Sequence, residues 1–226
     1  LVRRIPFLAL GGLVVLYTGG TGGAPITFNV STVAAVVAAA AGAGRVAGPV
    51  LVAKHGNRSR TGRGSAEVLS MLGVQIDAGP EVQAACLAQA GVCFCFAIHH
   101  HPAMKHAGPT RRSLGIPTIF NLLGPLTNPA GARHQLIGVY DAALVEPIAR
   151  ALVRLGAERA RVVHGAGGLD EVSIAGPTVC AVVEDGAMRM EEIDPAACGV
   201  KPAPVETIVA RDLEHAAALA RSVFAG

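Results

Sequence analysis

The chain has 226 residues, of which 51% are hydrophobic and 15% are charged. Because an average soluble domain has roughly 25% charged residues, this composition excludes a disordered tail and indicates a globular chain with a large core. The 19 Lys and Arg residues outnumber the 16 Asp and Glu residues, which gives a net charge of +3. No dense basic run accompanies this small excess, so non-specific nucleic-acid binding is not expected, whereas an anionic small substrate is compatible.

The N-terminal stretch combines Arg3 and Arg4 with an apolar run over residues 5–16. This order resembles the charged and hydrophobic regions of a secretory signal, but the run is too short to span a bilayer. It has no small-x-small cleavage site and continues directly into the glycine-rich residues 19–23. We therefore expect a buried strand that enters a glycine loop, with a signal sequence as the alternative, and we expect no membrane contact.

Beyond residue 18, short β-branched runs alternate with longer stretches rich in Ala and Leu. This alternation is typical of a mostly parallel sheet covered by helices, so the sequence predicts a single α/β domain over residues 1–226. Ser31 or Thr32 is expected to cap the first helix, which runs through Ala41 and stops at Gly42. The further expected helices span residues 65–72, 80–90, 104–114, 142–155 and 212–224. The expected strands span residues 49–53, 92–97, 135–140, 161–164, 178–184 and 205–209.

The glycine loop 20–23 lies directly before the first expected helix, whose start carries hydroxyl and amide side chains. Glycines let backbone N–H groups approach phosphate oxygens closely, and the free N–H groups of a helix N-terminus stabilise added negative charge. This pattern favours an anion site, with a simple turn and helix cap as the alternative.

A second glycine-rich loop, residues 54–65, follows the expected strand 49–53. It carries the cations Lys54, Arg58, Arg60 and Arg63 before a helix that starts at Ser65. Lysine supplies a point charge and arginine a two-pronged donor, so such a loop can clamp a polyphosphate. The alternative is a mobile, solvated loop.

The cysteines and a histidine run are expected to have packing roles. Five cysteines, an odd number without C-x-x-C spacing, favour a reduced cytoplasmic protein over a disulfide scaffold or zinc ribbon. Cys93 and Cys95 would lie on one face of a strand, which favours buried packing. The run 99–101 consists of three histidines, but consecutive residues of an extended turn point in different directions, and no second ligand cluster follows.

Arg111 and Arg112 lie on an expected helix, ahead of a tight apolar loop that contains Gly124 and Pro125. A guanidinium group binds a carboxylate, and the loop offers an apolar wall for a ring. This combination is suited to an aromatic acid.

Asp170 and Glu171 follow the expected strand 161–164. Adjacent carboxylates on a loop suit Mg²⁺, a hard cation that keeps several waters and bridges substrate phosphates. An Asp-Glu pair is most often surface charge, but the two phosphate-like loops in the same chain favour the metal interpretation.

Taken together, these motifs resemble those of the anthranilate phosphoribosyltransferases, a family of tryptophan biosynthesis. The resemblance runs from about Gly19 to Ser173 and rests on four blocks in the family's order. These blocks are residues 20–23 with 29–32, residues 54–58 with 64–66, residues 101–105 through 121–129, and residues 168–171. Chance agreement of four ordered blocks is excluded as an explanation.

The resemblance implies a fold and a reaction. The fold is the large phosphoribosyltransferase domain of the nucleoside phosphorylase and anthranilate phosphoribosyltransferase type. In the reaction, the amine of anthranilate attacks C1 of phosphoribosyl pyrophosphate (PRPP) and releases pyrophosphate with inverted configuration. Positioning and charge stabilisation dominate such a step, and it requires no general base.

The resemblance also implies a set of site residues. PRPP would be held by Gly20, Gly23, Thr27, Asn29, Val30, Ser31, Thr32, Lys54, Gly56 and Ser65. Anthranilate would meet Asn57, Arg111, Gly124 and Pro125, and His55 would help to orient its amine. Lys54 and Arg111 are the expected catalytic residues, and Mg²⁺ would be held by Ser31, Asp170 and Glu171. The family further implies a homodimer in a full-length form, through a small helical domain that is expected to be absent from this chain.

The sequence departs from the family at two loops. Gly23 is followed by Ala24 and Pro25 where the family continues with Asp-Gly, and this loop is one residue shorter. The second loop is also shorter, and Glu67 stands where the family usually has aspartate. These departures leave a weakened or inactive homologue that binds nucleic acid as one alternative. A pyrimidine nucleoside phosphorylase is another, although the Gly124-Pro125 block and the carboxylate pair favour the transferase.

Overall fold

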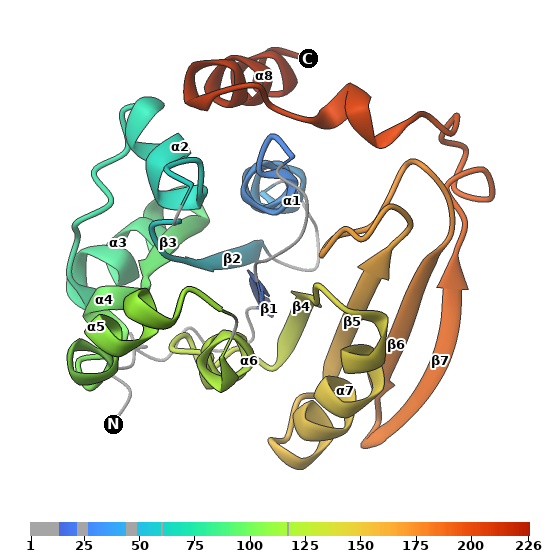
Figure 1. Ribbon diagram of the computed structural model, residues 1–226, viewed down its shortest axis with the longest axis horizontal. Helices are drawn as coiled ribbons and strands as arrows, with labels where there is room; N and C mark the ends of the chain where they lie inside the picture. The colour runs from blue at the N-terminus through green and yellow to red at the C-terminus, as the bar shows by residue number, and fades with distance from the viewer. Residues whose placement is uncertain (1–13, 22–26, 44–48, 60, 117) are drawn as a thin grey trace.

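The computed structural model describes residues 14–21, 27–43, 49–59, 61–116 and 118–226, and its strands form one seven-stranded sheet (Figure 1). The strand order across the sheet is β3-β2-β1-β4-β5-β6-β7. The first five strands run parallel, and β6 and β7 are antiparallel additions at one edge. The prediction of a mostly parallel α/β sheet is therefore confirmed. The strands are β1 (Val14–Gly20), β2 (Val50–Gly56), β3 (Val92–Phe96), β4 (His134–Gly138), β5 (Arg159–Gly165), β6 (Thr178–Glu184) and β7 (Ala187–Ile193).

Helices cover both faces of the sheet (Figure 1). Helix α1 packs on β1 and β2, and α8 packs on α1 and α2; α3, α6 and α7 cover the opposite face. The α-helices are α1 (Val30–Gly42), α2 (Ser65–Met71), α3 (Pro80–Ala90), α4 (Ala97–His100), α5 (Met104–Leu114), α6 (Ile119–Thr127), α7 (Val145–Arg154) and α8 (Leu213–Ala225). The short 3-10 helices η1 (Ala142–Leu144) and η2 (Val205–Ile208) complete the described elements.

Alternation along the strands divides the core between the two faces. Tyr17, Ala53 and Cys95 point toward α3, and a second cluster that contains Ile137 and Val162 lies beneath α7. Leu16 and Val52 point the other way, against α1. Lys54 and Thr18 are register partners on this α1 face, while His55 lies on the face of Tyr17. Neighbouring residues at the carboxyl end of β2 therefore lie on opposite faces of the sheet.

The strand order reverses between β1 and β4. From β1 the chain moves outward through β2 to β3, and it then returns to the centre and continues through β4 to β5 in the other direction. In open α/β sheets a crevice forms at the carboxyl ends of the strands at such a reversal, and ligands bind there. In this chain that position lies where Gly20 and Gly138 end their strands, with the Thr21 N–H donating to the Gly138 carbonyl at 3.0 Å.

Several predicted boundaries are confirmed, and others are wrong for identifiable reasons. The helices at 80–90 and 104–114 and the strand at 178–184 are confirmed to the residue. The strand predicted at 205–209 is wrong, because η2 forms there and only Val209 makes a β-bridge, to Thr27. The loop predicted around Gly124 and Pro125 is also wrong, since both residues lie inside α6. The antiparallel strand β7 was not predicted.

Three further differences concern the candidate site. The first helix is capped by neither Ser31 nor Thr32, because Asn29 occupies the N-cap position in a left-handed conformation. Strand β2 extends to Gly56, so Lys54 and His55 belong to the strand and not to the loop after it. The histidine run includes a short helix, α4, and not an extended turn. Residues 5–13 of the predicted first strand lie outside the described residues.

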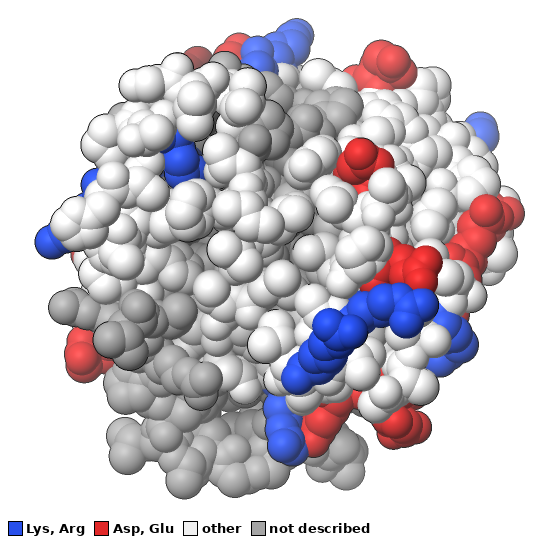
Figure 2. Space-filling model, turned by 60° about the horizontal axis from the view of Figure 1, so that its bottom comes forward, with Lys and Arg blue, Asp and Glu red and all other residues white. Residues whose placement is uncertain are grey.

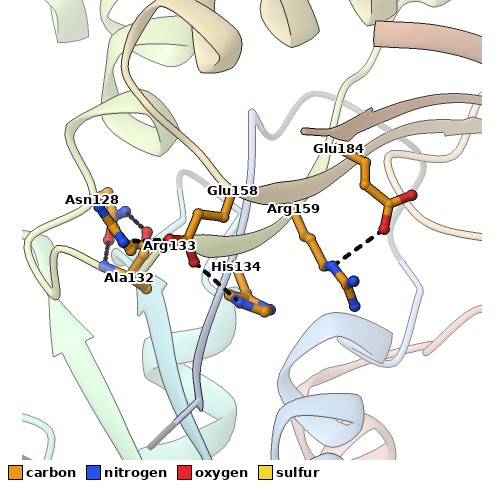
Figure 3. A network of polar contacts seen from close by, with 7 residues as sticks. All are labelled: Asn128, Ala132, Arg133, His134, Glu158, Arg159 and Glu184. Atoms are coloured by element: carbon orange, nitrogen blue, oxygen red, sulfur yellow. Dashed lines mark hydrogen bonds and ion pairs between the residues drawn. The ribbon is translucent and has the colours of Figure 1, made fainter. Parts of the chain in front are cut away.

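Polar contacts join neighbouring strands at the amino ends of the parallel strands (Figure 3). Arg133 pairs with Glu158, and His134 Nε2 lies 3.8 Å from Glu158 Oε2. Arg159 Nε lies 3.2 Å from Glu184 Oε1. Figure 2 shows charged side chains gathered toward one side of the face it draws, with few across its middle. Because the paired side chains are largely exposed, each pair contributes about 1 kcal/mol or less.

Within the described residues, no helix is both long and apolar enough to cross a membrane.

Candidate active site

Three glycines at strand ends make room for the loop that carries the carboxylates. A Cβ atom on Gly138 would lie 1.6 Å from the carbonyl oxygen of Asp170. A Cβ atom on Gly165 would lie 2.4 Å from the carbonyl oxygen of Glu171, and one on Gly20 would lie 2.8 Å from Asp170 Oδ2. The loop therefore crosses the carboxyl ends of β1, β4 and β5 in direct contact with their backbones. Gly138 and Gly165 were not predicted as site residues.

Glu171 lies at the N-terminus of α1. Its Oε1 accepts a hydrogen bond from Thr27 Oγ1 at 2.7 Å, and Ser31 contributes a backbone hydrogen bond. Burial, with a contribution from the nearby Asp170, raises the pKa of Glu171 to about 7, although the two hydrogen bonds act in the opposite direction. Thr27, Ser31 and Glu171, predicted from distant parts of the sequence, are thus brought together.

Lys54 is the buried cation of this site, with 4% of its surface exposed. Burial lowers the pKa of Lys54 to about 8, and the negative charges of Asp170 and Glu171 partly offset that effect. The end of β2 therefore places an ammonium group near the two carboxylates. A buried charge needs such compensation, because an isolated one would lose its proton.

The two predicted phosphate loops are held together by side chains. Thr32 Oγ1 donates to Ser65 Oγ at 2.8 Å, which joins the starts of α1 and α2. Asn29 Nδ2 donates to the Arg63 carbonyl at 3.1 Å. Asn29 has a φ of 64°, a region in which asparagine is favoured among residues with a side chain. Gly23, the other predicted residue of the first loop, lies outside the described residues.

Two cations of the second loop contact protein groups. Arg63 Nη1 donates to the Ala210 and Arg211 carbonyls, each at 2.9 Å, which ties the loop to the segment before α8. The Arg58 guanidinium lies over the Phe96 ring at 5.9 Å. Of the four cations of the predicted polyphosphate clamp, Lys54 lies near the carboxylates and Arg60 lies outside the described residues, so the clamp itself stays a prediction.

Glu67 anchors this second loop. Both of its carboxylate oxygens accept from the Ser59 backbone N–H, at 3.2 and 3.3 Å, and Ser59 Oγ accepts from the Arg63 N–H at 3.0 Å. We expect Glu67→Ala to lower the free energy of unfolding by about 1.5 kcal/mol, because hydrogen bonds to a charged group are lost. Urea unfolding measures this loss.

Glu81→Ala is the matched control, since Glu81 occupies the first turn of α3 as Glu67 occupies that of α2. It loses only the favourable interaction with the helix dipole, worth about 0.5 kcal/mol. Equal losses in the two variants would show that the Ser59 contact contributes nothing.

The opposite face of the sheet carries the predicted aromatic subsite. Arg111 Nη2 donates to Asn121 Oδ1 at 3.2 Å, and Asn121 Nδ2 donates to the Thr21 carbonyl at 3.2 Å. Pro125 is buried, and its Cβ lies 3.9 Å from where a Cβ of Gly19 would be. Helix α6 thus joins Arg111 to the end of β1. Asn121 was not predicted, although it lies inside one of the quoted blocks.

The remaining predicted residues have more ordinary surroundings. Asn57 is exposed, and its Oδ1 accepts from the Arg58 N–H at 2.8 Å. A Cβ on Gly124 would meet nothing within 4 Å, whereas one on Gly56 would meet the Phe94 ring at 2.8 Å. Cys93 and Cys95 are buried with their sulfurs 3.8 Å apart, which confirms their shared face. The packing role of the histidine run is confirmed for His100, whose Nε2 lies 2.7 Å from Gln83 Oε1 in the core.

His55 gives a prediction for the pH dependence of stability. Burial, followed by the charges of His101, His100 and Lys54, lowers the pKa of His55 from 6.5 to about 3. The folded protein then binds fewer protons than the unfolded chain between these values, so stability is lost as the pH falls through that range. The expected slope from this residue is about 1.4 kcal/mol per pH unit.

Urea unfolding between pH 3 and 7 of the wild-type protein and a His55→Gln variant measures this contribution. We expect the variant to lose less stability than the wild type as the pH falls. Parallel curves would contradict a buried neutral imidazole.

The donor groups at the end of β1 fit Mg²⁺. Oxygen ligands from one or two carboxylates, completed by waters and substrate phosphates, are what this ion prefers. Asp170 and Glu171 supply the carboxylates, and Ser31 in the first turn of α1 supplies a hydroxyl. Within the described part of the chain, no group of three or more His, Cys, Asp or Glu side chains is arranged to hold a metal ion. The donors present therefore suit an ion that substrate phosphates help to bind.

The fold and this site define an α/β protein that gathers a buried cation, two carboxylates and a helix N-terminus at the reversal of its strand order. The family described as glycosyl transferase family, a/b domain, matches residues 14–226. The chain therefore belongs to that glycosyl transferase family.

Its relatives have a common description. Proteins named anthranilate phosphoribosyltransferase from Methylobacterium nodulans and Rhizobium meliloti are 48% and 46% identical to this chain, over 96% and 99% of its length. The crystal structure of that enzyme from Thermus thermophilus has a TM-score of 0.82 and 43% identity over 97% of this chain. The enzyme from Saccharomyces cerevisiae in complex with PRPP and Mg has a TM-score of 0.80 and 28% identity over 98% of this chain.

The chain is shorter than these relatives. It spans 62% of the Methylobacterium protein and 64% of the Rhizobium protein. It also covers 62% of the Thermus chain and 58% of the Saccharomyces chain.

Proposed function

We propose that this chain transfers the phosphoribosyl group of PRPP to the amine of anthranilate, a step of tryptophan biosynthesis. The observation that carries the proposal is the meeting of Lys54, Asp170 and Glu171 with the N-terminus of α1, where the strand order reverses. A diphosphate and its counter-ion need this combination of a cation, carboxylates and the positive end of a helix.

On the α1 face, the residues bind and charge-stabilise PRPP. Lys54 and the positive end of the α1 helix dipole are placed to stabilise the negative charge that grows on the leaving pyrophosphate. Ser31, Asp170 and Glu171 would hold Mg²⁺, which when bound neutralises phosphate charge. Thr27 orients Glu171 through its hydrogen bond of 2.7 Å.

On the α6 face, the residues orient anthranilate. Arg111 supplies a guanidinium group for the carboxylate, and Pro125 supplies apolar contact for the ring. Asn57 and Gly124 are the further residues assigned to this subsite. The amine nitrogen forms a bond to C1 as the bond from C1 to the pyrophosphate oxygen breaks. Pyrophosphate leaves with the electron pair, and the amine proton passes to water.

The relatives of this chain also support the assignment. Proteins named anthranilate phosphoribosyltransferase are nearly 50% identical to this chain, and one relative was solved with PRPP and Mg. The five cysteines are all unpaired, in agreement with the cytoplasmic location expected from the sequence. We further propose that residues 1–226 serve as the α/β domain of such an enzyme, and a homodimer of the full-length form stays a prediction.

The two alternatives lose support from particular contacts. Nucleic-acid binding would use Arg58 and Arg63, but Arg58 lies over Phe96 and Arg63 donates to two backbone carbonyls. Nucleoside phosphorolysis needs one phosphate ion as the acceptor and not a diphosphate leaving group. The buried carboxylate pair fits the metal-bound diphosphate better.

Three assays on one sample separate these functions. The protein is incubated with PRPP, Mg²⁺ and anthranilate, and then with uridine and phosphate, and the products are identified by mass spectrometry. Binding to DNA and RNA is titrated at low and high salt. We expect phosphoribosyl-anthranilate as the product of the first reaction. Uracil release or salt-sensitive nucleic-acid binding without that product would instead support one of the alternatives.

A further inference from the structure

A buried tyrosine lies beneath the candidate aromatic subsite, in contact with His55. The Tyr17 hydroxyl lies 2.5 Å from His55 Nδ1, and both side chains are buried in the sheet face covered by α3 and α6. Their rings are tilted to each other, with centroids 5.8 Å apart. Neither the binding of PRPP nor the orientation of anthranilate, as described above, requires the hydrogen bond between Tyr17 and His55.

The other nitrogen of His55, Nε2, is unpaired among the residues that the structure describes. Within the described part of the chain, His55 Nε2 is buried and makes no hydrogen bond. A buried polar atom without a partner costs about 1 to 3 kcal/mol, so it is rarely retained unless a ligand or water satisfies it. His55 itself has 8% of its surface exposed.

His55 is connected through His101 to helix α6, which carries Gly124 and Pro125. The His101 ring is 5.2 Å from the His55 ring, and His101 Nε2 lies 3.3 Å from Thr127 Oγ1 on α6. A Cβ atom on Gly19 would lie 3.8 Å from the Tyr17 hydroxyl and 3.9 Å from Pro125 Cβ. The Tyr17 hydroxyl and Pro125 therefore both lie close to Gly19 near the end of β1, and His55 is joined to this position by its contact with Tyr17.

The direction of the Tyr17 hydrogen bond follows from proton counting. Burial raises the pKa of Tyr17 well above 10, so its hydroxyl keeps its proton, and the pKa of His55 is about 3, so the imidazole is neutral. If Tyr17 donates to Nδ1, the single imidazole proton must reside on Nε2. In the other tautomer the Tyr17 hydroxyl proton would need a second acceptor, and none is found among the described residues.

We propose that Tyr17 is a positioning residue that fixes the proton of His55 on Nε2 and so presents this N–H as a donor for the carboxylate of the aromatic substrate. This inference rests on the proposed function. An Nε2–H group cannot accept the proton of the attacking amine, and donation to the amine lone pair would suppress its nucleophilicity. A carboxylate oxygen is the acceptor that remains, and His55 then acts beside Arg111 and not as a base.

The tautomer is measured first, in the substrate-free protein. Histidine ring nitrogens are labelled with nitrogen-15, and the His55 signals are assigned by their loss in a His55→Gln variant. We expect a proton on Nε2 of His55 in the wild type and a mixture of tautomers in Tyr17→Phe, which keeps the ring and removes the hydroxyl. A wild-type proton on Nδ1, or an unchanged tautomer in Tyr17→Phe, would overturn the inference.

Binding separates positioning from loss of structure. We expect Tyr17→Phe to weaken anthranilate binding in proportion to the loss of the tautomer with its proton on Nε2, about twofold for an equal mixture, while PRPP binding with Mg²⁺ is unchanged. Tyr140→Phe, the same chemical change at the other tyrosine, is expected to alter neither. In a His55→Gln background, Tyr17→Phe should have no further effect. Equal weakening of both substrates by Tyr17→Phe would overturn the inference.

Failure of the proposed function gives a different result. A wild-type protein with its proton on Nε2 that bound no aromatic carboxylate would overturn the proposed substrate, and with it the carboxylate part of this inference. The tautomer assignment to Tyr17 would then stand by itself.

Discussion

Replacing Asp170 by asparagine and Glu171 by glutamine together is expected to reduce phosphoribosyl transfer by about 1000-fold or more. The two carboxylates lie where β1, β4 and β5 end, and Glu171 is held at the start of α1 by Thr27. Both substitutions keep the side-chain shape and remove the negative charge that would hold Mg²⁺. Loss of charge stabilisation for a leaving group has effects of this size.

The same double variant is expected to keep its fold. Burial raises the pKa of Glu171 to about 7, so an ionised carboxylate is not what stabilises this position. A glutamine oxygen can still accept the Thr27 hydrogen bond. Turnover and thermal unfolding measured on the same samples at pH 8 check both halves of the expectation. Glu146→Gln, which removes an exposed carboxylate from an ion pair on α7, is the control for charge loss.

Retained turnover in a folded double variant would contradict the metal and phosphate assignment. A parallel loss of activity and of the folded state would instead show that the carboxylates have a structural role.

Gly138→Ala is expected to damage both stability and activity. Its Cβ would lie 1.6 Å from the Asp170 carbonyl oxygen and 2.5 Å from the Asp170 carbonyl carbon. These are backbone atoms, so the loop must move by more than 1 Å. Overpacking of this kind costs about 3 kcal/mol, and a misplacement of about 1 Å reduces turnover roughly 100-fold. Urea unfolding and the rate of PRPP consumption measure the two effects.

Gly124→Ala is the matched control for stability, because it makes the same substitution inside helix α6 where a Cβ meets nothing within 4 Å. Alanine is favoured over glycine in a helix by roughly 0.5 to 1 kcal/mol, so a small gain is expected. If Gly138→Ala were as stable and active as the wild type, the loop could not pass across the end of β4 as described.

Much of the fold could be predicted because its elements carry local signals. The helix at 80–90 starts with a proline after Gly79 and ends at Gly91, which has a φ of 73°. The predicted strand at 178–184 is an apolar β-branched run that ends before Asp185 and Gly186. These stops act within a few residues, so a sequence pattern suffices to find them.

The missed elements depend on contacts from elsewhere in the chain. Helix α6 begins with a local cap of Thr118 and Asn121, but Gly124 and Pro125 inside it are typical of a loop, and contact with β1 supports the helix there. Strand β7 is largely exposed and charged, and it is joined to β6 by pairing and by the contact of Arg189 with Glu184 at 3.7 Å. Neither α6 nor β7 has a clear hydrophobic periodicity in its own sequence.

The candidate site, like the fold, combines residues that the sequence indicated with residues that it did not. The resemblance placed Lys54, Asp170 and Glu171 in the site, and the structure brings them together. The sequence did not indicate that Gly138 and Gly165 make room for the carboxylate loop, or that Arg63 faces the segment before α8. Gly138 contacts Asp170, 32 positions away, and Arg63 contacts Ala210, 147 positions away, so no local pattern carries these contacts. Gly165 lies only six positions before Glu171, but their close approach depends on how the loop turns back across the end of β5.

The most direct test of the account is the decrease of anthranilate fluorescence on addition of the protein, PRPP and Mg²⁺, with pyrophosphate measured in the same sample. We predict a decrease that requires all three components, stops when the divalent ion is chelated, and releases one pyrophosphate for each anthranilate consumed. A folded protein that binds PRPP with Mg²⁺ but leaves anthranilate fluorescence unchanged at saturating concentrations would contradict the proposed transferase activity.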